Sequence, residues 1–597
     1  MIMKNNINVI STGTVPSVIL TKAAHSVIST KAVGRMEKSA SKRSFDSALR
    51  ASLKMTKKLS FRAKSRNLLP TAAALCLLSS CTAGFYEMNT NPNQVTGDQM
   101  EVNNYRTGSK IRNLQNLVIP VQEHMYQFNE SLSGGPFAGY VASTVDTWLA
   151  RFETFNPSDD WRKWPFANVM SETYAPYRGI VNQSDDEVAN AFATLFRVAI
   201  MHRMTDSYGP IPYSNPITNE SVFVTYDSQE TVYSTMFDEL DSAIEDFTKN
   251  IGIAASSWNR YDYVYYGNIG QWLKYANSLK LRMAMRLSYV KPELAREKAA
   301  EAIAAGVITS NSDNALMHAP ENRTALIYND WSDSRVAADI INYMNGYEDP
   351  RREKMFTSVP VEQGGKTVEM YYGIRVGSDV SGKTAFTTSY SNMKITASDP
   401  YLWMNAAEVS FLMAEYELRW GDLARAKDLY ENGIRLSFEE RGAAGAEEYI
   451  LDSEKKPATY VDPLGTYSVA GRQSDITIAW EESGSLADGT VPAEDASERN
   501  LERIITQKWI ASFPLGVEGW SEYRRTGYPR LLPAPQDKSG GAVDLNRHAR
   551  RLPYPVEEYG MNGANLQQAI STLNSETKGD RKGDTMGTNV WWDCKQQ

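Results

Sequence analysis

The sequence predicts a mostly α-helical protein in which paired helices form a scaffold and long irregular segments cover it. Three observations predict this fold class. Apolar residues recur every three or four positions through much of the chain after residue 100, which is the spacing of one face of an α-helix. Two of these stripes are separated by only two residues near position 420, so the helices that carry them must fold back on each other. Residues 307–400 and about 442–496 lack the period and are rich in polar or turn-forming residues, apart from one helical island at 336–344.

The two adjoining stripes lie in residues 402–438. Their members are Val409, Leu412, Met413, Tyr416 and Trp420 in the first, and Leu423, Ala426, Tyr430 and Ile434 in the second. Small residues on both sides of the turn at Gly421 and Asp422, with Tyr430 further on, resemble a tetratricopeptide unit. Such a unit cannot bury its apolar face alone, so we expect other helices to pack on it. A generic helical hairpin is the alternative that this stretch alone leaves open.

Further helices are predicted along the chain. Their positions are 103–128, ended by Gly134-Gly135-Pro136; a helix opened by a capping box at 184–187 and stopped by Gly209-Pro210; 232–247; 269–287; 292–305; and a last long helix from Ser497.

The start of the chain reads as a targeting segment. From Met55 a basic stretch leads into an 11-residue apolar run at 68–78, which is far shorter than the roughly 20 residues that span a bilayer. The run ends in Leu78-Ser79-Ser80-Cys81, which resembles the lipobox of bacterial lipoproteins and predicts lipidation of Cys81; a plain signal peptide with an incidental cysteine is the alternative. We therefore expect residues 1–80 to be a leader and signal peptide, with Met55 as the true start, and residues 81–597 to form a single domain.

Charge and motif content narrow the function. Residues 1–80 hold 14 Lys/Arg against 2 Asp/Glu, a net charge of +12, whereas the whole chain has a net charge of −8. The remaining residues therefore carry a net charge of −20, which makes them a poor nucleic-acid binder. The five histidines are widely spaced, and the sequence contains no HExxH, P-loop, GxGxxG or GxSxG motif, so neither a metal nor a cofactor is expected. A glycosidase needs only two carboxylates, and 69 acidic residues follow position 80. The sequence therefore leaves a glycan hydrolase open as an alternative.

Four polar or aromatic positions attract attention but favour structural roles. Arg524 and Arg525 suit an acidic ligand, yet their position just after a predicted helix favours a partly buried ion pair that holds the C-terminal segment. Asp206 and Tyr208 precede the turn at Gly209 and are expected to be cap and turn residues.

Several motifs in a fixed order carry a family resemblance. They are the lipobox at Cys81 followed by NTNPN at 89–93, TDSYGPIPY at 205–213, WLKYANSLKLR at 272–282, Asp349-Pro350-Arg351, Ala407-Glu408-Val409, Gln507-Lys508-Trp509-Ile510, the stretch 520–529 with YRRTG, and RLPYP at 551–555. Together they resemble the SusD/RagB outer-membrane lipoproteins, in particular the divergent SusD-like branch.

The resemblance implies a function as well as a fold. It implies a tetratricopeptide-like helix scaffold with an irregular ligand-binding face, no covalent chemistry and no cofactor. It also implies a lipid-anchored protein of the outer membrane, facing outside, that binds oligosaccharides or peptides and passes them to a SusC-like TonB-dependent transporter. One departure concerns the outward orientation, because the acidic run often found after the lipidated cysteine is replaced here by Thr82-Ala83-Gly84-Phe85-Tyr86. The alternatives are an envelope scaffold without a small ligand and a glycan hydrolase.

Aromatic residues outside the helical stripes are the candidate ligand-binding residues. The chain has 13 Trp and 32 Tyr, and two stretches in irregular segments place rings beside polar groups. The candidates are Trp148, Trp161 and Trp164 in the first stretch, and Tyr328, Asn329, Asp330 and Trp331 in the second. Flat rings can stack on the C–H face of a pyranose, while Asn and Asp bind its hydroxyl groups. The alternative is that these rings close the core under a loop, because Trp is usually well buried.

Overall fold

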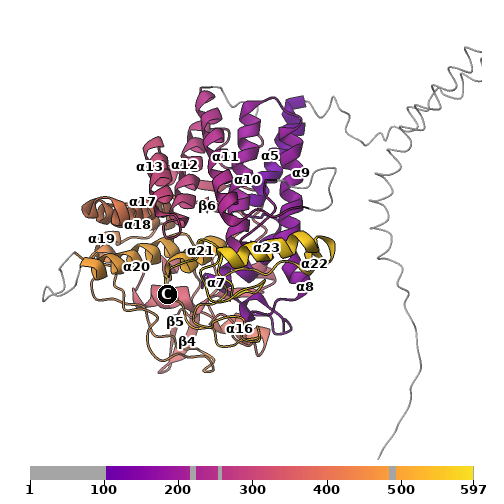
Figure 1. Ribbon diagram of the computed structural model, residues 1–597. Coiled ribbons are helices and arrows are strands. Elements are labelled where there is room, and N and C mark those ends of the chain that lie inside the picture. Colours follow the sequence, from indigo (N-terminus) through magenta and orange to yellow (C-terminus); the bar gives the residue numbers. More distant parts are fainter. Residues whose placement is uncertain (1–101, 215–223, 253–258, 483–492, 596–597) are drawn as a thin grey trace, which may run out of the picture. The chain divides into compact units, whose positions relative to one another are not determined.

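Paired helices dominate the computed structural model, which describes residues 102–214, 224–252, 259–482 and 493–595. The predicted lipidation site at Cys81 lies outside these residues. The long helices are α5 (Tyr105–Val118), α9 (Val169–Val181), α10 (Glu187–Tyr208), α11 (Gln229–Lys249), α12 (Ile269–Arg286), α13 (Pro292–Ala305), α17 (Ala406–Trp420), α18 (Leu423–Arg441) and α20 (Ala493–Ala511). In Figure 1, α5 and α9 to α13 stand side by side, whereas α17, α18 and α20 lie across the view. Contacts join α5 to α9, α10 to α11, α12 to α13 and α17 to α18. The prediction of a mostly α-helical scaffold of helix pairs is therefore confirmed.

The predicted helical hairpin is α17 and α18. Gly421 ends the first helix, and the side chain of Asp422 caps the second by accepting a hydrogen bond from the backbone N–H of Arg425 at 2.8 Å. The two helices approach closely at Gly433, where a Cβ atom would lie 2.7 Å from the ring of Phe411. Helices α12, α13 and α20 also contact α17, so the apolar face that a lone hairpin would expose is covered.

Further elements connect and cover these helices. The α-helical ones are α6 (Glu123–Tyr126), α7 (Gly135–Phe137), α8 (Asp159–Lys163), α14 (Ala338–Gly346), α15 (Arg352–Met355), α16 (Lys383–Ser389), α19 (Ala446–Ile450), α21 (Gly516–Thr526), α22 (Val556–Met561) and α23 (Gly563–Glu576). The 3₁₀ and π-helical turns are η1 (Val102–Asn104), η2 (Gln127–Gly134), η3 (Phe152–Thr154), η4 (Trp164–Asn168), η5 (Asn311–Asp313) and η6 (Leu326–Asp330).

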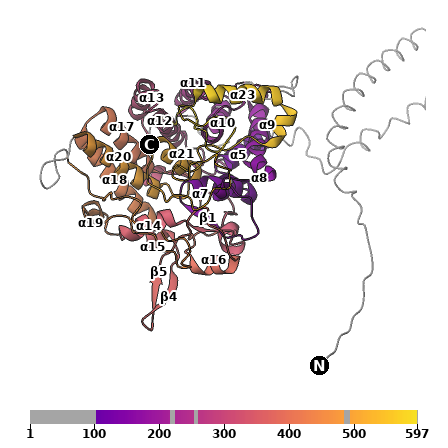
Figure 2. The same cartoon turned by 60° about the horizontal axis from the view of Figure 1, so that its bottom comes forward.

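The strands of the described residues form three two-stranded antiparallel sheets. These pair β1 (Val141–Ser143) with β3 (Ser334–Val336), β2 (Ala315–Met317) with β6 (Tyr401–Met404), and β4 (Val359–Gln363) with β5 (Lys366–Met370). The β4–β5 hairpin projects away from the helices in Figure 2. The first two sheets join segments about 90 to 190 residues apart, and both matter for the candidate site.

Some predicted boundaries are wrong. Gly134-Gly135-Pro136 does not end a helix, because Pro136 lies in the first turn of α7, where its missing N–H costs no hydrogen bond. Helix α10 is capped by Asp186, which accepts from the N–H of Ala189, and not by Ser184. Helix α20 begins four residues before the predicted Ser497. The segment 307–400 contains the predicted helical island as α14, but also α15, α16 and most of the strands.

Buried charges hold the helix pairs to the C-terminal segment. Arg286 of α12 pairs with Asp206 of α10 at 3.2 Å and with Glu518 of α21 at 2.6 Å. Asp206 also accepts hydrogen bonds from the hydroxyl of Tyr233 and the indole N–H of Trp592. Its carboxylate is therefore part of a buried network, and the prediction that it serves as a cap or turn residue is wrong.

The structural interpretation of the arginine pair is confirmed. Both guanidinium groups are fully buried. Arg524 donates to the backbone carbonyls of Asp206 and Arg550, at 2.6 and 2.9 Å. Arg525 forms an ion pair with Glu415 of α17 and Glu522 of its own helix. The pair fixes α21 between the helical hairpin and the C-terminal segment.

Candidate functional site

The first part of the candidate site is a surface row of aromatic rings built on one helical ridge. Helix α6 runs directly into the π-helical turn η2, and this ridge carries His124 and Phe128 four residues apart, so both side chains lie on one face. The ring of Trp331 stacks on His124 with centroids 5.1 Å apart and planes at 18°. Phe128 stacks on Trp164 at 5.2 Å and 13°. The two stretches predicted from the sequence therefore meet on the same ridge.

The remaining predicted indoles extend this row. Trp161 meets Phe128 edge-on at 5.5 Å, and Trp148 meets Trp161 edge-on at 5.2 Å. We call the six rings of Trp331, His124, Phe128, Trp164, Trp161 and Trp148 the aromatic row. His124 is exposed, and the other five rings are half-buried. Each ring is thus held by its neighbours while part of it stays open to solvent.

Strand pairing explains why distant stretches meet here. Strands β1 and β3 pair antiparallel with Ser143 opposite Ser334. The pairing extends one residue further, because the N–H of Thr144 donates to the carbonyl of Asp333 at 3.0 Å. The loop that leads to Trp148 and the loop that holds Trp331 therefore leave the sheet at the same end.

An ion pair fixes the second loop to the ridge. The guanidinium of Arg323 donates to both carboxylate oxygens of Glu123 in α6, at 2.6 and 2.8 Å. These hydrogen bonds lower the pKa of Glu123 to about 2, against the smaller opposing effect of burial. The pair thus remains ionised at neutral pH and holds the η6 segment beside α6.

The predicted polar residues divide between the surface and the core. Asn329 and Asp330 are exposed beside Trp331, and the side-chain amide of Asn329 donates to the carbonyl of Ile395 at 2.8 Å. Tyr328 is only 1% exposed, and burial raises the pKa of its hydroxyl to about 12. Its ring belongs to the core because the π-helical turn η6 directs it inward, so its prediction as a ligand-binding residue is wrong.

Sequence reasoning missed His124 and Phe128. Both lie inside the stretch 103–128 that was predicted as one helix, and their spacing of four residues is that of a helical stripe. No local signal separated them from a core stripe, because only the structure shows that Tyr126 and Glu130, two positions away, are buried. Residues two apart on a helix point in nearly opposite directions.

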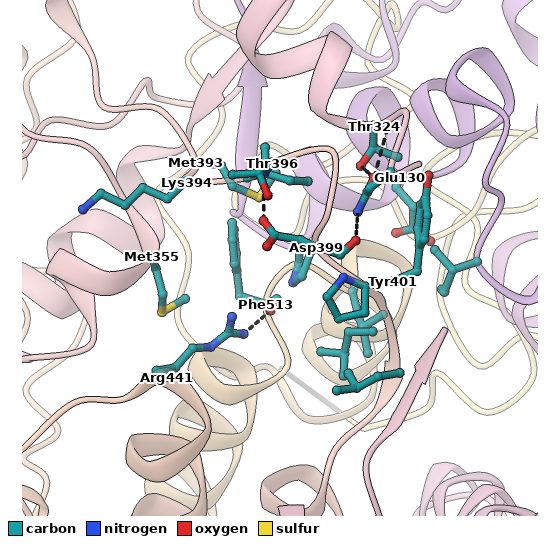
Figure 3. A pocket seen from close by; sticks show the side chains of 18 of the residues that line it. Glu130, Thr324, Met355, Met393, Lys394, Thr396, Asp399, Tyr401, Arg441 and Phe513 are labelled. Carbon is teal, nitrogen blue, oxygen red and sulfur yellow. Dashed lines mark hydrogen bonds between the residues drawn. The ribbon is translucent and has the colours of Figure 1, made fainter. Parts of the chain in front are cut away.

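The second part of the candidate site is a pocket on the opposite face of the same ridge. It has a volume of about 760 Å³, and Tyr126 and Glu130 line it. Figure 3 shows Glu130 among the lining side chains. This volume is within the range of about 300–1,000 Å³ that is typical of small-molecule sites. Of the seven residues predicted to bind ligand, Asn329 lines the pocket.

Among the described residues, no group of three or more His, Cys, Asp or Glu side chains is placed to hold a metal ion. No helix among them is long and apolar enough to cross a bilayer. The geometry is that of a binding surface: flat rings that are partly open to solvent, with the exposed Asn329 and Asp330 beside Trp331.

Comparisons with known proteins agree on one family. A family model described as "SusD-like: Susd and RagB outer membrane lipoprotein" matches residues 87–593. A search of curated proteins gave no significant match. Among solved structures, a SusD homologue from Bacteroides thetaiotaomicron VPI-5482 is 50% identical, with a TM-score of 0.77 over 83% of this chain and 100% of that one.

Two further structures extend the comparison. A SusD homologue from Bacteroides ovatus ATCC 8483 is 42% identical, with a TM-score of 0.75 over 82% of this chain and 99% of that one. A chitin-binding SusD homologue from Flavobacterium johnsoniae is 35% identical, with a TM-score of 0.71 over 82% of this chain and 98% of that one. Since the family model covers most of the sequence and the structural matches cover nearly all of their own chains, this chain belongs to the SusD-like family of outer-membrane lipoproteins.

Proposed function

We propose that this protein is a cell-surface lipoprotein that captures an oligosaccharide on the aromatic row and delivers it to a partner TonB-dependent outer-membrane transporter. Membership in the SusD-like family supports a nutrient-binding role and a place in the outer membrane. The observation that carries the proposal is the aromatic row itself, in which Trp331 stacks on His124, and Trp164, Trp161 and Trp148 gather around Phe128 four residues further along the same ridge, all partly open to solvent.

The chemistry of the row fits a chain of sugar units. A pyranose presents a face of C–H groups that packs on an indole or imidazole ring, and a row of rings can hold successive units of one chain. The exposed amide of Asn329 and carboxylate of Asp330, beside Trp331, are placed to bind hydroxyl groups. The similarity to a chitin-binding homologue supports a glycan rather than a peptide as the ligand.

Anchoring and delivery complete the proposal. Lipidation of Cys81, followed by the polar stretch 87–96, would tether the domain to the membrane surface. A tethered binding domain can stay beside a transporter while it captures ligand, and it needs no catalytic group of its own.

The test is direct binding of defined oligosaccharides by the purified domain, with chitin oligomers included because of the chitin-binding homologue. We expect isothermal titration calorimetry to detect a glycan that binds, and Trp331→Ala to weaken it by about 1–3 kcal/mol, the value of burying a large apolar side chain. Trp420→Ala is the matched control, because Trp420 is also half-buried but packs on Tyr416 at the far end of α17.

Three outcomes would contradict the proposal. Equal binding of a glycan by wild type and by variants at Trp331, Trp164 and Trp148 would remove the aromatic row as the site. Binding of peptides but of no glycan in a broad array would change the ligand class, and hydrolysis of a bound glycan would make the protein an enzyme. Co-purification of a transporter-sized partner in mild detergent tests the delivery step.

A further inference from the structure

The pocket behind the ridge has a wall suited to an apolar group. Met355, Met393 and Phe513 are each less than 5% exposed and line it together with the half-buried Leu402. Leu402 of β6 faces Leu316 of β2 across the small sheet, so one side of the pocket is a fixed strand pair. Methionine side chains adapt to irregular apolar shapes. The wall differs from the aromatic row, where flat rings dominate.

Two of the three acidic groups in the pocket already have partners. Glu130 pairs with Arg203 and accepts the backbone N–H of Val517. The carboxylate of Glu440 accepts from the side-chain amides of Asn405 and Asn314, at 2.8 and 3.3 Å. Both groups are therefore held by the protein itself.

The third acidic group lies at the mouth of the pocket. Asp399 is exposed, and one of its carboxylate oxygens accepts from the backbone N–H of Thr396 at 2.7 Å. Solvent screens its charge, yet it repels an anion placed next to it.

The cationic groups in the pocket have hydrogen-bond donors that no acceptor among the described residues uses. The guanidinium of Arg441 uses one nitrogen to donate to the carbonyl of Phe513 at 2.6 Å, as Figure 3 shows. In the part of the chain that the structure describes, its Nε is buried and has no hydrogen-bond partner. Lys354 and Lys394 line the pocket with exposed side chains, and the ammonium of Lys394 donates to the carbonyl of Glu353. The Nε of Arg441 is covered by protein atoms, so the donor open to a ligand is the remaining nitrogen, Nη1, for which the described part of the chain supplies no hydrogen-bond acceptor.

We propose that this pocket is a second ligand site that binds a compact amphiphilic anion, a carboxylate, sulfate ester or sulfonate attached to an apolar body. The anionic group would accept from Arg441, and the apolar body would lie between Met355, Met393 and Leu402. Lys354 at the rim adds attraction, while Asp399 keeps the anionic group away from the mouth. The pocket shares Asn329 with the edge of the aromatic row, but the anion is placed at Arg441, and Tyr126 and Glu130 point away from His124 and Phe128 on the ridge between the two sites.

The test uses a matched pair of fluorescent probes on the full domain. 8-Anilinonaphthalene-1-sulfonate carries an apolar ring system and an anionic group, and N-phenyl-1-naphthylamine has the same rings without the anion. We expect the sulfonate to bind with one-to-one stoichiometry and about tenfold more tightly than the neutral probe, the ratio expected of one charge-assisted hydrogen bond.

Three substitutions locate the anionic group. Arg441→Gln should weaken binding of the sulfonate about tenfold and leave binding of the neutral probe unchanged. Asp399→Asn should strengthen binding of the sulfonate a few-fold, because it removes the repelling charge. Lys354→Gln should weaken it about twofold to threefold, and since Lys354 is exposed, this variant reports on the site even if Arg441→Gln does not fold.

A variant that fills the pocket tests whether the probes bind there. Leu402→Trp, which fills the pocket, should abolish binding of both probes while chitin oligomers bind as before. Equal affinity for the two probes, sulfonate binding that none of the charge variants alters, or binding that persists in Leu402→Trp would each overturn the proposal. These results are independent of glycan binding at the aromatic row, so failure of one proposal does not affect the other.

Discussion

Arg525 and Glu415 lie 110 residues apart in the sequence and form a bidentate ion pair in the interior, with both N–O distances at 2.6 Å. Both side chains are fully buried. The pair joins α21 to α17, and Arg525 also pairs with Glu522 at 2.6 Å. Burial alone would favour the neutral form of Glu415, but Arg525 and Arg419 lower the pKa of that carboxyl below its ordinary value. The contact therefore fixes the position of the C-terminal segment on the helix-pair scaffold.

Removing this arginine should be strongly destabilising. Arg525→Leu removes the bidentate partner of Glu415. Of the cations among the described residues, it leaves Arg419 beside Glu415, and Arg286 and Lys508 beside Glu522. We expect this loss to lower the free energy of unfolding by about 3–5 kcal/mol. Urea denaturation measures the change. Lys427→Ala is the control, because the pair of Lys427 with Glu482 is exposed and should contribute less than about 1 kcal/mol. Equal losses in the two variants would show that the buried pair contributes nothing beyond a surface one.

Replacing two helical glycines by alanine should change the stability of the protein in opposite directions. Gly433 faces Phe411 across the α17–α18 contact, and a Cβ there would lie 2.7 Å from the ring, so Gly433→Ala should cost about 1–3 kcal/mol through overpacking. Gly560 in α22 has no neighbouring atom within 4 Å of an added Cβ, so Gly560→Ala should be neutral or stabilise by up to about 1 kcal/mol. Thermal unfolding of both variants checks this, and a stabilised Gly433→Ala would refute the close packing.

A buried carboxyl predicts a pH-dependent loss of stability. Asp339 accepts hydrogen bonds from the side-chain amide of Gln473 and the N–H of Leu532, both at 2.7 Å. Burial raises its pKa from 3.8 to about 7. The folded protein therefore binds more protons than the unfolded chain between these two values, so this contribution to stability is full below about pH 3.8 and is lost as the pH rises to about 7.

Asp339→Asn should remove that loss, because an amide oxygen can accept the same hydrogen bonds without ionising. The stability of the variant relative to wild type should rise across this pH window and stay constant above it. Buried His202 and His548, whose pKa values burial lowers to about 3 and about 4, act in the opposite sense but equally in both proteins. Urea midpoints measured across the window check the prediction, and a constant difference would contradict the raised pKa.

Within the aromatic row, the central and outer rings should behave differently. Trp161 contacts Trp148, Phe128 and Phe152, so Trp161→Ala should lower the melting temperature as well as glycan affinity. Trp331 contacts one ring of the row, the exposed His124, so Trp331→Ala should lower affinity with little change in melting temperature. A large loss of stability in Trp331→Ala, with glycan binding intact, would assign this ring to the core.

The predicted lipid anchor can be tested by fractionation. Cys81→Ala should move the protein from the membrane fraction to the soluble fraction, because acyl chains contribute about 0.8 kcal/mol per buried CH₂. An expression frame that begins at Met55 should be exported as well as the full frame. Unchanged membrane retention of Cys81→Ala would show that another feature holds the protein there.

The sequence by itself determined the helix pairs, because their spacing is a local property. The stripe from Val409 to Trp420, the turn at Gly421 and Asp422 and the stripe from Leu423 to Ile434 need only one another to specify a hairpin. The same local logic identified the motifs of the family and singled out Trp148, Trp161, Trp164 and Trp331 as rings outside the helical stripes.

Only the tertiary structure decided which of those rings share a surface. The antiparallel pairing of β1 with β3 joins segments nearly 200 residues apart, and no local pattern specifies such a pairing. The π-helical turn η6 buries Tyr328 while leaving Asn329 exposed, and the ridge of α6 and η2 presents His124 and Phe128 to one side and Tyr126 and Glu130 to the other. Which face of a helix is solvated depends on what packs against it, and that information lies in residues far away in the chain.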